Sequence, residues 1–211
     1  MSALVAAGAI TYPADGTAAA VLVLAHGAGA GQKHPFMVAM ATGLAARRIS
    51  VVTFDFPYMQ RRRHVPDPAP VLEQCFRDVV DATREWSGSA RVFIGGKSMG
   101  GRIATHLGAE GLDSVQGIVA LGYPLHPPGR PDKPRTAHLP SIRVPLLIVQ
   151  GERDTFGTPT ELQPVIETMA APVTLHVVAG GDHSLGVRSR KKEQIYGEVL
   201  DVVASWMRAS G

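Results

Sequence analysis

Short apolar runs alternate with longer segments of helical periodicity along most of the chain. The runs are rich in Val, Ile and Leu and are apolar at successive positions, as in strands covered on both faces. They occupy residues 20–25, 50–54, 91–95, 117–122, 145–150 and 173–179. Segments with a helical pattern lie between them, at residues 35–48, 68–86, 101–109, 159–169 and 192–207. This alternation predicts an α/β protein with a mostly parallel sheet and helices on both faces.

One segment interrupts the alternation. Residues 123–143 contain six prolines and no helical period, which predicts a long surface loop. No repeat or low-complexity linker divides the chain, so residues 1–211 are predicted to form a single domain. The residues before position 13 could add an edge strand to the sheet.

Composition and charge narrow the class of protein. Apolar residues make up 45% of the chain and charged residues 18%, which is ordinary for a globular protein. A net charge of +3 is too small to predict a nucleic-acid partner. The single cysteine, Cys75, cannot form an internal disulfide, and no Cys/His spacing predicts a metal or another cofactor. Without a secretory start or an apolar run long enough for a membrane, we expect a cytoplasmic monomer or homodimer.

The strongest chemical signal is Gly96-Lys97-Ser98-Met99-Gly100, between an apolar run and a helical segment. A G-x-S-x-G pattern alone is weak, but a sharp strand-to-helix turn here would expose the serine in a strained conformation. Gly96 and Gly100 would leave room for that turn. Ser98 would then lie at a helix N-terminus, where N–H groups favour a developing negative charge. Ser98 is the predicted nucleophile, and the alternative is a glycine-rich turn with a spectator serine.

A serine hydroxyl needs a base to activate it and a third group to orient the base. His183 is the predicted base because it follows the last apolar run, and loops at the carboxyl ends of parallel strands bind ligands. Asp154 is the predicted third member, since a turn shortly after the preceding run can direct it back toward the histidine. Glu152 is the alternative carboxylate, whereas Asp182 would point away from the base.

Two backbone N–H groups usually stabilise the oxyanion of acyl transfer. Met99, directly after the nucleophile, is predicted to supply one of them. The glycine-rich loop at residues 26–31 follows the first apolar run and is predicted to supply the other from Ala28. The glycine spacing of this loop fits neither the dinucleotide-binding fingerprint nor a nucleotide P-loop. His26 is expected to brace the loop.

Together these motifs resemble those of the α/β-hydrolase superfamily. The order Ser98, Asp154, His183 is that of its triad, and the likeness covers residues 22–207. The Gly-Lys-Ser-Met-Gly-Gly-Arg and His-Gly-Ala-Gly-Ala-Gly segments look most similar to small, capless, dienelactone hydrolase-like and carboxylesterase-like bacterial members. That branch is related to the hydrolase-like domain of a histone-acetyltransferase complex subunit. The resemblance implies an α/β-hydrolase fold of six to eight strands, and residues 123–143 are too few for a full cap domain.

Several residues near the predicted strand ends could contact a substrate. Lys97 could attract an acidic substrate or pair with a carboxylate in the surrounding loops. Three successive arginines at residues 61–63 could bind a carboxylate or phosphate, although a solvated basic loop is the commoner explanation. Tyr58, Tyr123 and Phe156 could line an acyl pocket or belong to the core.

The sequence favours a serine hydrolase that cleaves small carboxylic esters or thioesters through an acyl-enzyme on Ser98. The expected partner is a small-molecule acyl substrate, because no cap is available to line a deep pocket. Two alternatives stay open: a peptidase or amidase with the same triad, and a non-catalytic binding or scaffold protein that keeps the fold. The presence of every catalytic element favours an enzyme.

Overall fold

A computed structural model describes residues 3–18, 20–112 and 114–210. Within these residues, seven strands form one sheet in the order β1-β3-β2-β4-β5-β6-β7. Every neighbouring pair is parallel except β1 and β3, which are antiparallel. The strands are β1 (Ile10–Tyr12), β2 (Ala20–Ala25), β3 (Ile49–Phe54), β4 (Arg91–Lys97), β5 (Ile118–Leu121), β6 (Leu146–Gly151) and β7 (Val173–Val178).

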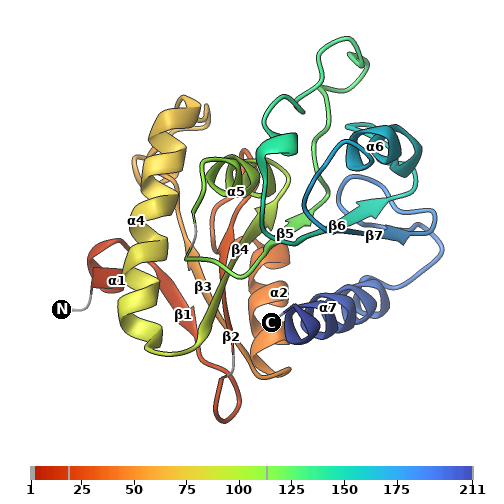
Figure 1. Cartoon of the computed structure of the whole chain (residues 1–211). Helices are drawn as coiled ribbons and strands as arrows, with labels where there is room; N and C mark the ends of the chain where they lie inside the picture. The colour runs from red at the N-terminus through yellow and green to blue at the C-terminus, as the bar shows by residue number, and fades with distance from the viewer. Residues whose placement is uncertain (1–2, 19, 113, 211) are drawn as a thin grey trace.

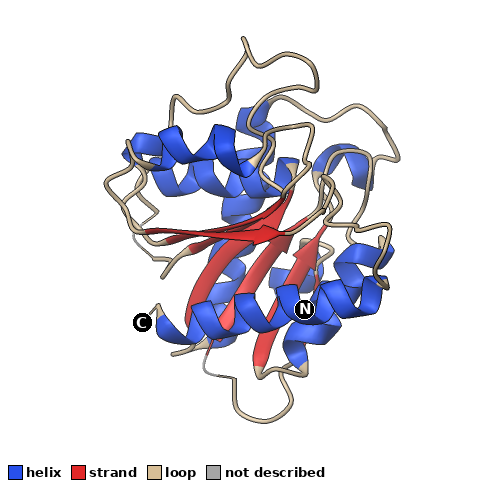
Figure 2. Cartoon of the chain, turned by 90° about the vertical axis from the view of Figure 1, so that its right-hand side faces the viewer, coloured by secondary structure: helices blue, strands red, loops and turns tan. Residues whose placement is uncertain are grey.

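Helices cover both faces of this sheet (Figures 1 and 2). They are α1 (Ala3–Ala6), α2 (Pro35–Ala45), α3 (Pro57–Gln60), α4 (Ala69–Ser87), α5 (Met99–Ala109), α6 (Pro159–Ile166) and α7 (Lys192–Ala209), with a 3-10 turn, η1 (Leu139–Ser141). The helices α4 and α5 pack on one face, and α2 and α7 pack on the other. None of the helices in the described part of the chain combines the length and hydropathy that a membrane crossing requires.

Alternate residues of the central strands feed two separate hydrophobic cores. In β2, Val21 and Val23 pack on the side of α4 and α5, whereas Leu22 and Leu24 pack on the side of α2 and α7. All four side chains are almost completely buried. Burial of such a side chain contributes about 1.5–3 kcal/mol, so a strand covered on both faces must be apolar at successive positions.

The predicted order of strands and helices is confirmed. Each of the six apolar runs forms a strand, and the edge strand expected before position 13 is β1. The short helices α1 and α3 were not predicted, because one helical turn is too short to show a period. Helix α5 begins at Met99, two residues earlier than predicted, directly after the candidate nucleophile.

The prediction of a surface loop at residues 123–143 is only partly correct. Residues 129–134 are exposed, but Tyr123, Leu125, Leu139 and Ile142 are buried in the core beside α5. Prolines prevent a regular helix here without preventing burial of the apolar side chains between them. The segment therefore covers one side of the molecule and is too short to form a separate cap.

Two glycines allow α5 to lie directly against the ends of β2 and β4. A Cβ atom on Gly100 would lie 2.5 Å from the carbonyl oxygen of Ala25 and 2.7 Å from that of His26. A Cβ atom on Gly96 would lie 2.6 Å from the same Ala25 oxygen. The opposing atoms belong to the backbone, so a side chain could be accommodated only if an element moved.

We predict that Gly100→Ala lowers the free energy of unfolding by about 1–3 kcal/mol, because overpacking forces backbone shifts of this cost. Urea denaturation measures the change. Gly197→Ala in α7 is the matched control, since no atom lies within 4 Å of its added Cβ. That substitution should leave stability unchanged or raise it by up to about 1 kcal/mol. Equal effects of the two substitutions would contradict the packing argument.

Candidate active site

Ser98 occupies a strained turn between β4 and α5. Its backbone has φ 50° and ψ −114°, in a region that non-glycine residues rarely adopt. The strain costs about 1–3 kcal/mol and persists only where the surroundings hold it. Here the Ser98 amide donates to the Leu121 carbonyl at 3.0 Å, and the Arg102 amide donates to the Ser98 carbonyl at 3.0 Å. The turn exposes the Ser98 hydroxyl at the carboxyl end of the sheet.

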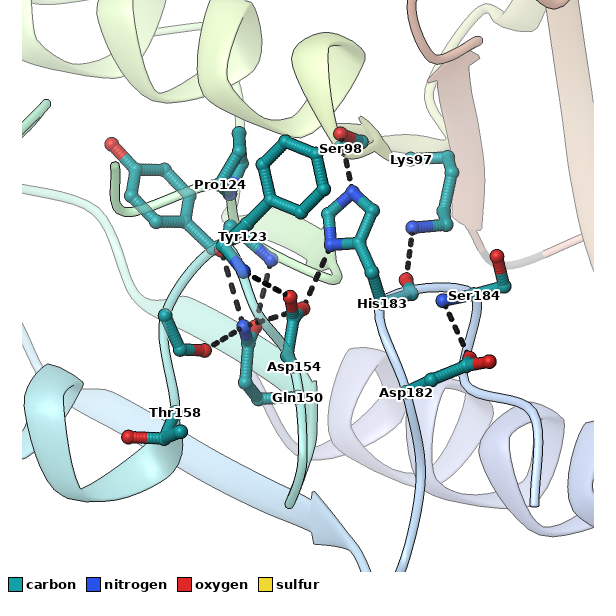
Figure 3. Close-up of polar contacts among 12 residues, drawn as sticks. Lys97, Ser98, Tyr123, Pro124, Gln150, Asp154, Thr158, Asp182, His183 and Ser184 are labelled. Carbon is teal, nitrogen blue, oxygen red and sulfur yellow. Dashed lines mark hydrogen bonds and ion pairs between the residues drawn. The ribbon is translucent and has the colours of Figure 1, made fainter. Parts of the chain in front are cut away.

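The structure brings Ser98, His183 and Asp154 into one chain of hydrogen bonds (Figure 3). His183 Nε2 lies 2.8 Å from Ser98 Oγ, and His183 Nδ1 lies 2.8 Å from Asp154 Oδ2. An ionised carboxylate only accepts, so Nδ1 carries the imidazole proton and Nε2 is free to accept from the serine hydroxyl. The three residues follow β4, β6 and β7. They meet at the carboxyl ends of these strands because the strands are parallel.

Gln150, at the end of β6, holds the Asp154 carboxylate in place. Its Nε2 donates to Asp154 Oδ2 at 2.9 Å and to the Tyr123 carbonyl at 3.1 Å, while its Oε1 accepts from the Tyr123 amide at 2.7 Å. The Phe156 amide donates to the other oxygen, Oδ1, at 2.8 Å. Gln150 was not identified from the sequence, although a polar residue closing an apolar run is the signal that marks it. The fully buried carboxylate is therefore oriented from three sides.

Lys97 directly precedes Ser98 and points toward the loop of His183. Its ammonium donates to the His183 carbonyl oxygen at 2.5 Å (Figure 3). Burial lowers the pKa of Lys97 to about 8, and the nearby charges of Asp154 and Asp182 act in the opposite direction. Lys97 lines the cavity, but its ammonium binds the loop of His183. Of the two interpretations offered by the sequence, this contact agrees with a side chain that pairs within the surrounding loops. Its partner is a backbone carbonyl and not a carboxylate.

Phe156 lies against the imidazole of the candidate base. The two rings are stacked, with centroids 4.1 Å apart and planes inclined by 28°. Phe156 also lines the cavity beside Ser98, where the sequence-based prediction placed it. The contact limits rotation of the imidazole and covers one of its faces.

Backbone amides at Ala28 and Met99 are available to stabilise a negative charge. Both residues line the cavity together with Ser98. In the part of the chain that the structure describes, neither amide donates a hydrogen bond within the protein. The Ala28 loop is braced by His26, which is fully buried and accepts from the Phe56 amide at 3.1 Å. Because burial lowers the pKa of His26, its ring is neutral and serves as a brace.

The cavity above the triad has a volume of about 840 Å³. Apolar side chains on its wall include Phe36, Met37, Leu72 and Phe156. Arginine, lysine and aspartate side chains lie among them, so the cavity presents both apolar surface and charge.

Tyr58 and Tyr123 do not reach this cavity, which corrects their prediction as substrate contacts. Both are fully buried. Tyr58 packs against His26 behind the glycine-rich loop, with ring centroids 5.9 Å apart. The Tyr123 hydroxyl donates to the Arg135 carbonyl at 2.7 Å. Each ring turns inward because the backbone directs it to the core, an orientation that the sequence does not reveal.

The other charged residues singled out in the sequence lie outside the hydrogen-bond chain of Ser98, His183 and Asp154. Residues 61–63 are exposed and do not line the cavity, in agreement with a solvated basic loop. Glu152 accepts from the Gly180 amide at 2.6 Å and braces the loop after β7. Asp182 accepts from the amides of Ser184 and Gly186 at 2.8 and 2.9 Å. Of the carboxylates considered from sequence, Asp154 is the one in contact with His183.

The sheet order and the strand-turn-helix around Ser98 define an α/β-hydrolase fold. The sequence model of the α/β hydrolase domain family matches residues 18–209, and the chain therefore belongs to that family.

Solved structures share the same architecture at low sequence identity. Dienelactone hydrolase from Anabaena variabilis superposes with a TM-score of 0.75 at 18% identity, over 95% of this chain and 90% of that one. A serine hydrolase without a lid from Xanthomonas campestris gives 0.73 at 19% identity, over 94% and 88%. An α-β serine hydrolase homologue from Coxiella burnetii gives 0.76 at 15% identity, over 93% and 89%. These similarities establish the fold.

Gln150→Met is predicted to lower kcat for Ser98-dependent hydrolysis by about 10- to 100-fold, with little change in KM. The substitution keeps the side-chain volume but removes the hydrogen bonds of Gln150 to Tyr123, Gly157 and Asp154. The bond to the charged Asp154 carboxylate is worth about 1.5–3 kcal/mol, which sets the expected loss of rate. Steady-state kinetics below the melting temperature of the variant provide the measurement. Gln163→Met, on the exposed face of α6, is the control and should retain wild-type kcat. An unchanged kcat in Gln150→Met would show that Asp154 needs no such support.

Lys97 should make stability depend on pH. Between about pH 8 and its usual pKa of 10.5, the unfolded chain keeps the Lys97 proton that the folded protein releases. The unfolded state then binds more protons, so the free energy of unfolding rises with pH. Wild type should accordingly gain stability relative to Lys97→Met across this range, as measured by urea denaturation at successive pH values. Lys133→Met, at an exposed position, is the control and should show no such trend. If the difference in free energy of unfolding between wild type and Lys97→Met stays constant with pH, the argument is refuted.

Proposed function

We propose that this protein is a serine hydrolase that cleaves small carboxylic esters or thioesters through an acyl-enzyme on Ser98. The observation that carries the proposal is the continuous Asp154–His183–Ser98 hydrogen-bond chain at the floor of a cavity. Membership of the α/β hydrolase family and the resemblance to esterase-like serine hydrolase folds support hydrolysis as the reaction class.

In the acylation step, Ser98 Oγ attacks the carbonyl carbon of the ester as His183 Nε2 accepts the hydroxyl proton. The carbonyl π electrons move to oxygen, and the Ala28 and Met99 amides stabilise the resulting oxyanion. Asp154 stabilises the imidazolium through its Nδ1–H bond. When the tetrahedral intermediate collapses, the bond to the leaving alcohol or thiol breaks and the imidazolium returns its proton to that group.

In the deacylation step, water takes the place of the leaving group. His183 accepts a proton from the water, which attacks the acyl carbon and forms a second oxyanion. Collapse of this intermediate breaks the bond to Ser98 Oγ, and His183 reprotonates the serine. The carboxylic acid leaves, and the hydrogen-bond chain is restored.

The size of the cavity favours small substrates. Its volume of about 840 Å³ suits a molecule of drug-like size or smaller, and the described residues form no cap domain that would extend it. Phe156 and Leu72 provide apolar surface for a short acyl chain.

Hydrolysis of p-nitrophenyl acetate and butyrate tests the proposal. Ser98→Ala should lower kcat/KM by about a thousandfold or more while leaving the folding transition intact, because the residual rate comes from binding and the oxyanion donors alone. Ser141→Ala, at the exposed turn η1, is the control and should match wild type. A fluorophosphonate probe should label wild type and not Ser98→Ala. Unchanged hydrolysis in Ser98→Ala would refute the mechanism.

A panel of matched ester, thioester and amide substrates then separates the alternatives. Preference for esters or thioesters supports the proposed function, whereas preference for the amide would indicate a peptidase or amidase. A well-folded protein inert toward every substrate and toward the probe would indicate a non-catalytic binding protein.

A further inference from the structure

Two arginines, Arg102 and Arg135, line the cavity of Ser98 without taking part in the triad. Arg102 lies one helical turn beyond Ser98 on α5, and its amide donates to the Ser98 carbonyl. Arg135 comes from the proline-rich segment that follows β5. Both residues are half-buried, so their charges are partly removed from water.

Neither guanidinium has an anionic partner in the part of the chain that the structure describes. Arg135 makes one long side-chain hydrogen bond, from Nη1 to the Pro124 carbonyl at 3.5 Å. Arginines elsewhere on the surface do form ion pairs: Arg47 with Asp201, Arg63 with Asp67, Arg77 with Glu110, Arg130 with Asp132 and Arg190 with Glu198. Several other surface arginines also form no ion pair, but among the described residues Arg102 and Arg135 are the arginines that line the cavity of Ser98.

The two positive charges lie close enough to act on each other. Burial lowers the pKa of Arg135, and the charge of Arg102 lowers it further. Both charges also act on the phenol of Tyr123, whose pKa is raised by its own burial. Like charges held together without a counter-ion leave a repulsion that a bound anion would relieve.

The backbone of Arg135 is held in place from outside the cavity. Its carbonyl accepts from the Tyr123 hydroxyl at 2.7 Å, and its amide donates to the Leu125 carbonyl at 2.7 Å. Since Tyr123 is also bonded to Gln150, the arginine and the triad share one buried framework. This arrangement gives the otherwise irregular segment a fixed position beside Ser98.

The carboxylates that line the cavity do not neutralise these arginines. Asp67 Oδ1 accepts from Arg63 at 2.6 Å, and Asp67 Oδ2 is buried without a hydrogen-bond partner. Asp182 binds backbone amides of its own loop. In the part of the chain that the structure describes, neither carboxylate therefore forms an ion pair with Arg102 or Arg135.

We propose that Arg102 and Arg135 form an anion subsite that binds a carboxylate or phosphate group of the ester substrate. Guanidinium groups suit this role, because they stay charged and donate two parallel hydrogen bonds to planar or tetrahedral oxyanions. The inference rests on the proposed function and narrows it to esters or thioesters that carry an anionic substituent.

The helix geometry sets where that substituent lies. Residues four apart on a helix share a face, with Cβ atoms roughly 5–6 Å apart, and the Arg102 side chain extends the reach further. An anion held by Arg102 would lie a few bonds from a carbonyl positioned at Ser98. Half-esters of short dicarboxylic acids and short phosphorylated esters have this spacing.

Binding to Ser98→Ala tests the subsite without requiring turnover. The probes are monomethyl glutarate and 2-acetoxyethyl phosphate, with uncharged dimethyl glutarate as the matched reference, each titrated by calorimetry. We expect at least one anionic probe to bind about tenfold or more tightly than dimethyl glutarate. When Arg102→Gln or Arg135→Gln is combined with Ser98→Ala, each should lower the affinity for the anionic probe about tenfold. The affinity for dimethyl glutarate should not change. The stronger of the two anionic probes identifies the carboxylate or the phosphate as the preferred group.

Arg130→Gln supplies the control, because Arg130 lies in the same segment but is exposed, pairs with Asp132 and does not line the cavity. It should not change the affinity for any probe. In otherwise wild-type enzyme, Arg102→Gln should raise KM for mono-p-nitrophenyl glutarate about tenfold more than it raises KM for p-nitrophenyl valerate, so that the ratio of the two KM values changes.

The two proposals can fail separately. Equal binding of charged and uncharged probes, or unchanged anion affinity in both arginine variants, would overturn the subsite even if Ser98-dependent hydrolysis is observed. Arginine-dependent anion binding in a protein without hydrolytic activity would support the subsite and refute the proposed function.

Discussion

The close contact between α5 and the end of β2 determines the geometry of the whole site. Because Gly96 and Gly100 have no side chains, the helix begins against the backbone of Ala25 and His26. This contact forces Ser98 into its positive-φ turn and places it beside the glycine-rich loop that follows β2. Ser98 and the amides of Ala28 and Met99 are therefore positioned by one packing constraint, to which the side chains of Asp154 and His183 do not contribute.

The positions of Asp154 and His183, the other two members of the proposed triad, depend on the parallel sheet. The carboxyl ends of adjacent parallel strands lie side by side, so loops distant in sequence bring Asp154 and His183 to Ser98. The buried carboxylate is satisfied by Gln150 and by a backbone amide, which makes its burial tolerable and restricts its orientation. The same glutamine reaches Tyr123, so the triad and the irregular segment after β5 form one polar network.

The sheet and much of the candidate site could be predicted from local pattern. Apolar runs mark the strands of the sheet, and Ser98, Asp154 and His183 each follow one of these runs. The direction of a single side chain could not be predicted in this way, because it depends on packing between distant segments. Tyr58 and Tyr123 therefore turned out to be buried. Likewise, Gln150 and the residues of the proline-rich segment have no periodic pattern that would relate them to the site.

Lys97 links β4, the central strand of the sheet, to the loop that follows the outermost strand β7. Lys97 ends β4, which has strands on both sides. His183 follows β7, the outermost strand of the sheet, in which several residues are incompletely buried. Edge strands open more readily than central ones. Through its bond to the His183 backbone, Lys97 ties the loop after β7 to the residue next to Ser98. We expect this bond to restrain His183 against motions of the outer strand, so that the distance between His183 Nε2 and Ser98 Oγ depends on the central strand β4.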